Sequence, residues 1–130
     1  MTASETKTDA TMSGHNRILV SDHGLISIVR FTDRKIVDSA NIEQLGDELN
    51  SVVLDDKRDV LLLNFEGVDF MSSAALNKLI SLNSKIKSVQ GRLKLCNLKP
   101  DIREVFSMTK LDRVFDIRES EADAIAAFRV

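Results

Sequence analysis

Apolar residues along this chain follow two spacings, one typical of β-strands and one typical of amphipathic helices. Short runs rich in Ile, Val, Leu and Phe predict five strands, at 18–20, 25–31, 60–65, 93–98 and 114–117. The run Val60–Phe65 is almost wholly apolar, which is typical of a central strand that is covered on both faces.

Between the later strands, apolar residues recur at steps of three and four, and this spacing predicts four helices. The first two span 41–53 and 76–89, the third opens at Pro100, and the fourth is capped by Ser120. Gly91 is expected to end the second helix as its C-terminal glycine. The residues predicted to face the core are Ile42, Leu45, Leu49, Val52, Ala75, Leu76, Leu79, Ile80, Leu82, Ile86, Val89, Ile102, Val105, Phe106, Ala122, Ile125 and Ala126.

The order of these elements, β-β-α-β-α-β-α-β-α, indicates a single domain with an α/β fold. Strands that alternate with helices pair in parallel, and the opening hairpin makes the sheet of about five strands mixed but mostly parallel. We expect the four helices to pack mainly on one face of this sheet. Residues 1–16 are rich in Thr and Ser without a periodic pattern, so we expect a disordered N-terminal tail before a domain at 17–130.

Composition narrows the classes of partner and the location. The net charge of −2 comes from 18 basic and 20 acidic residues, so the balance gives no argument for binding nucleic acid or an anionic membrane. No apolar run approaches the roughly 18 residues of a membrane span, and the N-terminus lacks the apolar core of a secretory signal. One cysteine, Cys96, fits a reducing compartment. We therefore expect a cytoplasmic protein.

The polar residues do not assemble into a catalytic or metal-binding pattern. Glu66 and Asp69 lie close together, but nothing pairs them with a nucleophile. His15 and His23 have no Cys or carboxylate at the spacing of metal ligands, and the five glycines are too scattered for a phosphate-binding loop. The sequence predicts no catalytic residue, no metal and no cofactor, and it favours a binding module over an enzyme.

Two adjacent hydroxyls, Ser72 and Ser73, mark the point where the loop after the central strand turns into a helix. The first amides of a helix have no intrahelical partner and the helix dipole is positive there. A serine at this place caps the helix, and it is also well placed to carry a phosphate. Both roles fit, because Ser72 can cap while Ser73, one residue into the helix, points outward.

The loop Val68–Leu76 and the segments around it resemble the STAS domain family, and within it the bacterial anti-sigma factor antagonists. The resemblance covers about 18–128 and rests on the segments 61–65, 68–76, 91–98, Pro100, 105–106 and 111–115. In that family the loop commonly has the order aromatic, Met or Ile, Asp, Ser, Ser or Thr, Gly, Leu. Ser72 stands at the family's Asp position and Ala75 at its Gly position, and both are departures.

The resemblance implies a partner-switching role for this chain. The first Ser after the Asp is the phosphorylated one in the family, which makes Ser73 the expected phosphorylation site and Ser72 the second choice. The implied partners are an anti-sigma factor with serine kinase activity and a phosphatase. The alternative is a non-phosphorylated STAS scaffold subunit of a stress-signalling assembly, or a soluble STAS partner of a membrane transport system.

The residues around Ser73 predict a contact surface. Small polar side chains at steps of three and four, from Ser73 to Ser88, form a strip with little side-chain entropy to lose on docking. Phe70 and Met71 are expected to add an exposed apolar rim, although Met71 also fits a core position. We expect a monomer or weak dimer. The predicted partner-binding residues are Asp69, Phe70, Met71, Ser72, Ser73, Ala74, Asn77 and Ser81.

Overall fold

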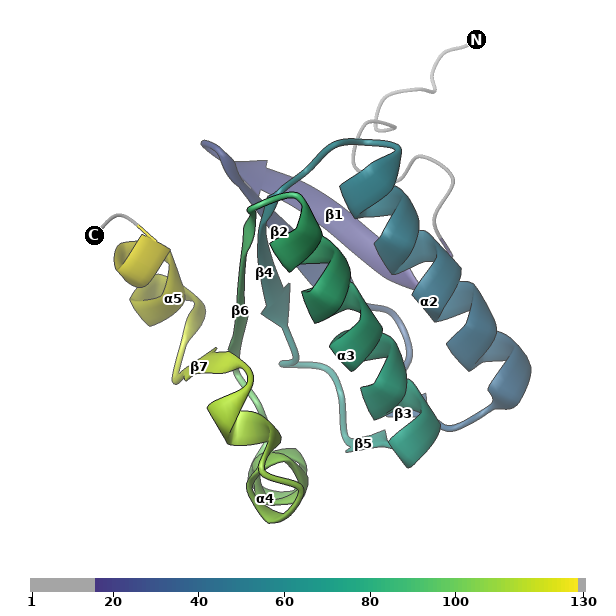
Figure 1. The fold of residues 1–130 in the computed structure, drawn as a ribbon. Coiled ribbons are helices and arrows are strands. Elements are labelled where there is room, and N and C mark those ends of the chain that lie inside the picture. The colour runs from purple at the N-terminus through teal and green to yellow at the C-terminus, as the bar shows by residue number, and fades with distance from the viewer. Residues whose placement is uncertain (1–15, 129–130) are drawn as a thin grey trace, which may run out of the picture.

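Five strands form the central sheet in a computed structural model that describes residues 16–128 (Figure 1). Strands β1 and β2 form an antiparallel hairpin, and the later neighbours in the sheet are parallel. The mixed, mostly parallel sheet confirms the predicted fold class. The predicted tail, apart from Asn16, lies outside the described residues. In sheet order the strands are β1 (Ile18–His23), β2 (Ile26–Phe31), β4 (Val60–Asn64), β6 (Arg92–Cys96) and β7 (Asp116–Arg118).

The predicted helices are all present in the described part of the chain, and the second of them starts three residues earlier than its apolar pattern indicated. A short 3-10 turn, which the sequence did not predict, separates the last helix but one from β7. These elements are α2 (Ser39–Leu54), α3 (Ser73–Ser88), α4 (Pro100–Met108), η2 (Leu111–Arg113) and α5 (Glu121–Phe128).

Strand β4 separates two hydrophobic cores. Leu61 and Leu63 face the larger core, which lies beneath α2 and α3, and Leu62 faces a smaller core beneath α5. All three leucines are fully buried, as expected for a central strand covered on both faces. Helices α2 and α3 lie side by side on one face of the sheet and α5 lies on the other (Figure 1). Helices α2, α3 and α4 thus contribute residues to the larger core, and α5 is the exception.

The inward face of α5 differs from the prediction. Ala124 and Phe128 are buried, whereas Ala122 and Ala126 are exposed, so the prediction for those two alanines is wrong. The large ring of Phe128 decides which face docks, because an aromatic side chain buries far more apolar area than an alanine. The predicted cap is confirmed, since the Ser120 Oγ accepts a hydrogen bond of 3.1 Å from the Asp123 amide.

Gly91 has a different role from the predicted helix-ending glycine. The left-handed residue after α3 is Gln90, with φ of 60°, and Gly91 does not have a positive φ. A Cβ atom on Gly91 would lie only 2.3 Å from the carbonyl oxygen of Asp59. Close approach of the backbone, in a segment where the Arg92 amide donates to that same carbonyl, therefore accounts for glycine at this position.

A second, two-stranded sheet was not predicted. Strand β3 (Lys35–Ile36) pairs in parallel with β5 (Phe70–Met71), and the pair lies at the end of the molecule where α3 begins (Figure 1). The last strand also begins later than predicted, at Asp116, because Phe115 packs its ring against Phe106 in the larger core at a centroid distance of 5.8 Å.

Candidate functional site

The start of α3 brings the two predicted serines to the edge of the domain. Ser72 is the N-cap residue: its backbone is extended, and its Oγ accepts a hydrogen bond of 3.3 Å from the Ala75 amide. The Ser72 amide donates to the carbonyl of Ile36 in β3 at 3.0 Å, which fixes the loop against the small sheet. The capping role predicted from the sequence therefore belongs to Ser72.

Ser73 is the first residue of α3 and its side chain is exposed. The first turn of α3 contains no acidic residue. Unpaired amides and the positive end of the helix dipole therefore act on a group attached to Ser73 without competition from a carboxylate in that turn. This environment stabilises a negative charge on the Ser73 oxygen.

Asp69 joins three elements behind the serine loop. Its Oδ2 accepts hydrogen bonds from the Nε and Nη2 of Arg34, at 2.9 and 2.8 Å, and its Oδ1 accepts one from the Nζ of Lys99. These bonds, from Lys99 and then from Arg34, hold the pKa of the Asp69 carboxyl below its ordinary value of 3.8. Asp69 is therefore an ionised clamp between the loops before β3, β5 and α4.

The expected apolar rim is only half present. Phe70 is 51% exposed, but Met71 is 5% exposed and belongs to the larger core, so Met71 is not part of an exposed rim. Successive residues of a strand point to opposite sides, and the core takes Met71 together with Ile36, its partner in β3. The choice left open for Met71 is thus decided in favour of the core.

Beneath Phe70 lies a small apolar cavity of about 160 Å³. Its walls come from β5, from Leu76 of α3 and from the first turns of α4, so α4 meets there the segment that leads from β5 into α3. The lining residues are Asp69, Phe70, Met71, Leu76, Asp101, Ile102 and Val105. We refer to this cavity as the Phe70 pocket.

A second hollow of about 280 Å³ runs between α2 and α3. From α3 it includes the predicted contact residues Ala74, Asn77 and Ser81, and Ala74 and Asn77 are exposed. From α2 it adds residues that the sequence analysis missed, namely Glu43, Gly46, Asp47 and Asn50. Lys78 closes the gap with an ion pair to Glu43 at 3.1 Å. A sequence pattern does not encode which helices lie side by side. The α2 residues of this hollow could therefore be found only from the structure.

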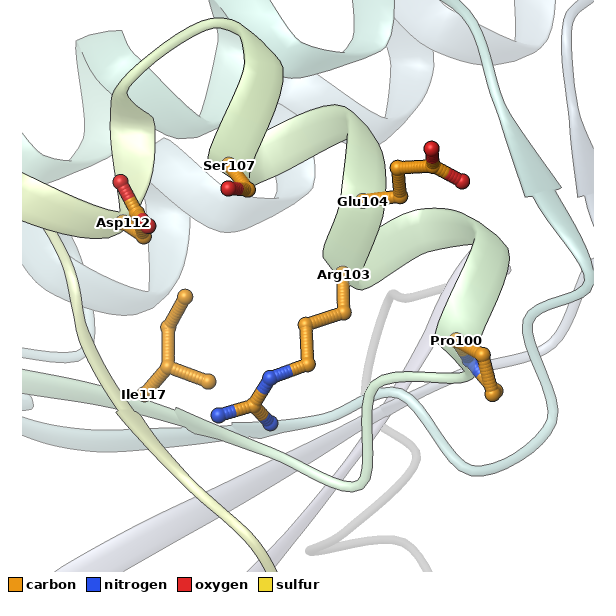
Figure 2. A pocket seen from close by; sticks show the side chains of 6 residues that line it. All are labelled: Pro100, Arg103, Glu104, Ser107, Asp112 and Ile117. Atoms are coloured by element: carbon orange, nitrogen blue, oxygen red, sulfur yellow. The ribbon is translucent and has the colours of Figure 1, made fainter.

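A third hollow, beside α4, offers no catalytic arrangement. About 520 Å³ is enclosed by Pro100, Arg103, Glu104, Ser107, Asp112 and Ile117. Figure 2 shows Arg103 reaching from α4 toward Ile117. Arg103 forms an ion pair with Glu119 at 3.3 Å, so the charge of its guanidinium group is balanced within the fold. Within residues 16–128, the Ser107 hydroxyl makes no hydrogen bond to a base that could activate it as a nucleophile.

Two further features bear on chemistry. Among residues 16–128, no group of three or more His, Cys, Asp and Glu side chains is arranged to hold a metal ion. Burial, together with the charge of Glu121, raises the pKa of the Cys96 thiol to about 12, so this cysteine is a core residue and not a nucleophile.

In the described part of the chain, no helix is long and apolar enough to cross a membrane.

The fold and the serine-bearing helix start define a small α/β domain of the STAS type. The chain belongs to the STAS domain family: the model of that family matches residues 17–124. BtrV of Bordetella bronchiseptica, described as a candidate anti-sigma factor antagonist, is 39% identical over 94 residues, which are 72% of this chain and 80% of BtrV.

Two solved structures extend the comparison. An anti-sigma factor antagonist from Mycobacterium paratuberculosis is 26% identical with a TM-score of 0.76, over 87% of this chain and 93% of that one. SpoIIAA of Bacillus, in its phosphorylated form, is 20% identical with a TM-score of 0.66, over 85% of this chain and 98% of that one. The second likeness, at this identity, shows the shared fold alone.

Proposed function

We propose that this protein is an anti-sigma factor antagonist whose partner is an anti-sigma factor with serine kinase activity. The unmodified form binds that partner and so releases the sigma factor. The kinase phosphorylates Ser73, which ends the complex, and a phosphatase restores the unmodified form. The observation that carries this proposal is the exposed hydroxyl of Ser73 on the first turn of α3, next to the capping serine.

The comparisons favour this function over the scaffold and transport alternatives. The relative of 39% identity bears the description of an anti-sigma factor antagonist. SpoIIAA, which shares the fold, has been solved in a phosphorylated form, so a domain of this fold accommodates the modification. The exposure of Ala74 and Asn77 beside Ser73 supports a contact face along α3.

The physical basis of the switch is the charge of the phosphate. Phosphorylation adds about −1.5 to −2 charges, which the dipole at the start of α3 tolerates within the fold. The same charge pressed into a surface built for a neutral hydroxyl is costly, because like-charge contact and desolvation oppose binding. A penalty of roughly 3 kcal/mol already lowers affinity about 100-fold.

The test is binding of the cognate anti-sigma factor to Ser73→Asp, measured by isothermal titration calorimetry. We expect Ser73→Asp to bind at least about 100-fold more weakly than the wild type while its urea midpoint is unchanged or slightly raised. Ser84→Asp is the matched control, because it adds the same charge to an exposed residue of the same helix, three turns away.

Phosphorylation is tested separately. Intact-mass measurement after incubation with the anti-sigma factor and ATP is expected to show one added phosphate on the wild type and none on Ser73→Ala. If the phosphate remains on Ser73→Ala, the modified residue is another one. If Ser73→Asp binds as tightly as the wild type, the switch at this position is wrong.

A further inference from the structure

The Phe70 pocket differs in character from the polar helix start beside it. Met71, Leu76 and Ile102 are buried in its walls, Val105 is half-buried, and the exposed ring of Phe70 stands at its mouth. A single exposed ring is ordinary, but a ring that adjoins an apolar cavity makes one continuous apolar surface, and such surfaces mark interaction sites.

The pocket is held open by the ionised clamp of Asp69. Asp69 ties the segment that precedes Phe70 to Lys99, which is the residue before α4, and to Arg34, which precedes β3. The Asp69 and Phe70 amides donate to the Arg34 carbonyl at 2.7 and 3.2 Å, so the β5 wall is also fixed by backbone bonds, and none of these bonds depends on a partner. A preformed pocket reduces the entropy that binding must overcome.

The volume selects the size of the occupant. A dry cavity of about 150 Å³ with similar apolar walls holds one benzene molecule. The Phe70 pocket, at about 160 Å³, therefore suits one apolar side chain of about that size, such as leucine or methionine, and neither a cofactor nor a length of helix.

The rim of the pocket is charged unevenly. Lys35 pairs with Phe70 across the small sheet and is exposed on the same side, while Ile36 and Met71 both point into the core. Asp101, on the opposite wall, is exposed in the first turn of α4. The charge of Asp69 between them is matched by Arg34 and Lys99. A basic residue of β3, beside Phe70, and an acidic residue of α4 thus flank the pocket.

We propose that the Phe70 pocket receives one aliphatic anchor side chain of the anti-sigma factor, flanked by an acidic group that faces Lys35 and a basic group that faces Asp101. This inference rests on the proposed function and adds a second point of attachment to it, next to Ser73 but independent of phosphorylation. Lys35, Asp101 and Val105 become specificity-determining residues of the contact.

The first experiment measures binding of the cognate anti-sigma factor to Val105→Phe, which fills the pocket from α4. We expect affinity to fall about tenfold or more while the urea midpoint stays near that of the wild type. Asp101→Lys is expected to weaken binding severalfold, and Glu104→Lys is its matched control on the same helix, because Glu104 lines the hollow on the other side of α4.

The second experiment needs no partner protein. Methyl NMR spectra are recorded during titration with N-acetyl-leucine amide and, as a control, N-acetyl-serine amide. We expect saturable shifts of the methyl signals of Met71, Leu76, Ile102 and Val105 with the leucine compound alone, and loss of these shifts in Val105→Phe.

The outcomes separate the two proposals. If the wild type binds the anti-sigma factor and the folded Val105→Phe binds it equally well, the anchor is wrong and the proposed function stands. If the wild type does not bind the anti-sigma factor, both are wrong. If the same methyl signals move with protein concentration alone, the occupant is a second copy of this chain and the inference is overturned.

Discussion

The two adjacent serines have different environments although they are the same residue type. Ser72 caps α3 through its Oγ, whereas the side chain of Ser73 is exposed and no hydrogen bond of its hydroxyl occurs within residues 16–128. Their mutational effects are therefore expected to divide between stability and binding, which gives a direct check of the assignment.

Removal of the cap is expected to destabilise the protein. Ser72→Ala leaves an amide of the first turn of α3 without its acceptor and is expected to cost about 1 kcal/mol of unfolding free energy. Ser73→Ala is expected to change the unfolding free energy by less than about 0.5 kcal/mol, because it removes an exposed hydroxyl and alanine favours a helix. Urea denaturation of both variants checks the difference. Equal losses would contradict the division of roles.

The clamp at Asp69 predicts a pH dependence of stability. Because the folded protein lowers the pKa of Asp69 below 3.8, the carboxylate contributes stability above pH 3.8, and this contribution is lost as the pH falls through the lowered value. Asp69→Asn is therefore expected to be less stable than the wild type at pH 7, with the difference shrinking in that acid range.

Urea midpoints measured from pH 7 down to pH 2.5 check the prediction for Asp69. Asp112→Asn is the control, because the Asp112 carboxylate makes no ion pair within residues 16–128. A difference between Asp69→Asn and the wild type that does not change with pH would mean that shape, and not charge, accounts for the role of Asp69.

At the scale of elements, the long strands and helices were predictable and the shortest ones were not. The helix over Ile42–Val52 and the strand Val60–Phe65 carry apolar patterns long enough to define their period. Strands β3 and β5 have two residues each, too few for any period, and their pairing depends on residues 35 apart in sequence. The sequence predicted α4 but not its place beside β5, because the contact between them joins segments that are far apart in sequence.

Two glycines, Gly46 within α2 and Gly91 in the connection from α3 to β6, differ in what a side chain would meet. Gly91→Ala would place a Cβ atom 2.3 Å from the Asp59 carbonyl, which is backbone and cannot move aside cheaply. Gly46→Ala in α2 meets only the flexible side chain of Lys78, whose Cδ is the nearest atom at 2.7 Å. We expect Gly91→Ala to lose about 2 kcal/mol or more, whereas Gly46→Ala is neutral or gains up to about 1 kcal/mol.

The measurement for this pair is thermal and urea unfolding under identical conditions. Both variants make the same chemical change, so the comparison isolates the surroundings of the added methyl group. If Gly46→Ala is the more damaging of the two, then the hollow between α2 and α3 is more rigid than the flexibility of Lys78 implies.

At the scale of the whole molecule, α5 is set apart from the other helices. Among the helices within residues 16–128, it is the one that covers the smaller core, and Figure 1 shows it on the side of the sheet away from α2 and α3. Its first residue, Glu121, accepts hydrogen bonds from Arg30 at 2.5 Å and from the buried Asn64 at 2.7 Å. The Asn64 Oδ1 in turn accepts a hydrogen bond of 2.9 Å from the amide of Glu66, a residue of the loop that leads from β4 to Phe70.

This chain of bonds predicts local opening at α5. Glu121→Ala leaves the amide of Asn64 buried without its acceptor, which costs about 1–3 kcal/mol. Because α5 docks through a small core of its own, we expect the cost to appear as local unfolding, with amide exchange in α5 accelerated about tenfold or more. Exchange at Glu66 is expected to rise with it, whereas exchange in α2 and α3 stays unchanged.

Hydrogen exchange followed by mass spectrometry distinguishes local from global effects. Glu119→Ala is the control, because its ion pair with Arg103 lies at the surface and such pairs contribute about 0–1 kcal/mol. Uniform acceleration across α2, α3 and α5 in Glu121→Ala would mean that the two cores unfold as one unit. Acceleration confined to α5 and to the loop that contains Glu66 would mean that the stability of α5 is coupled, through Asn64, to the segment that leads to Phe70.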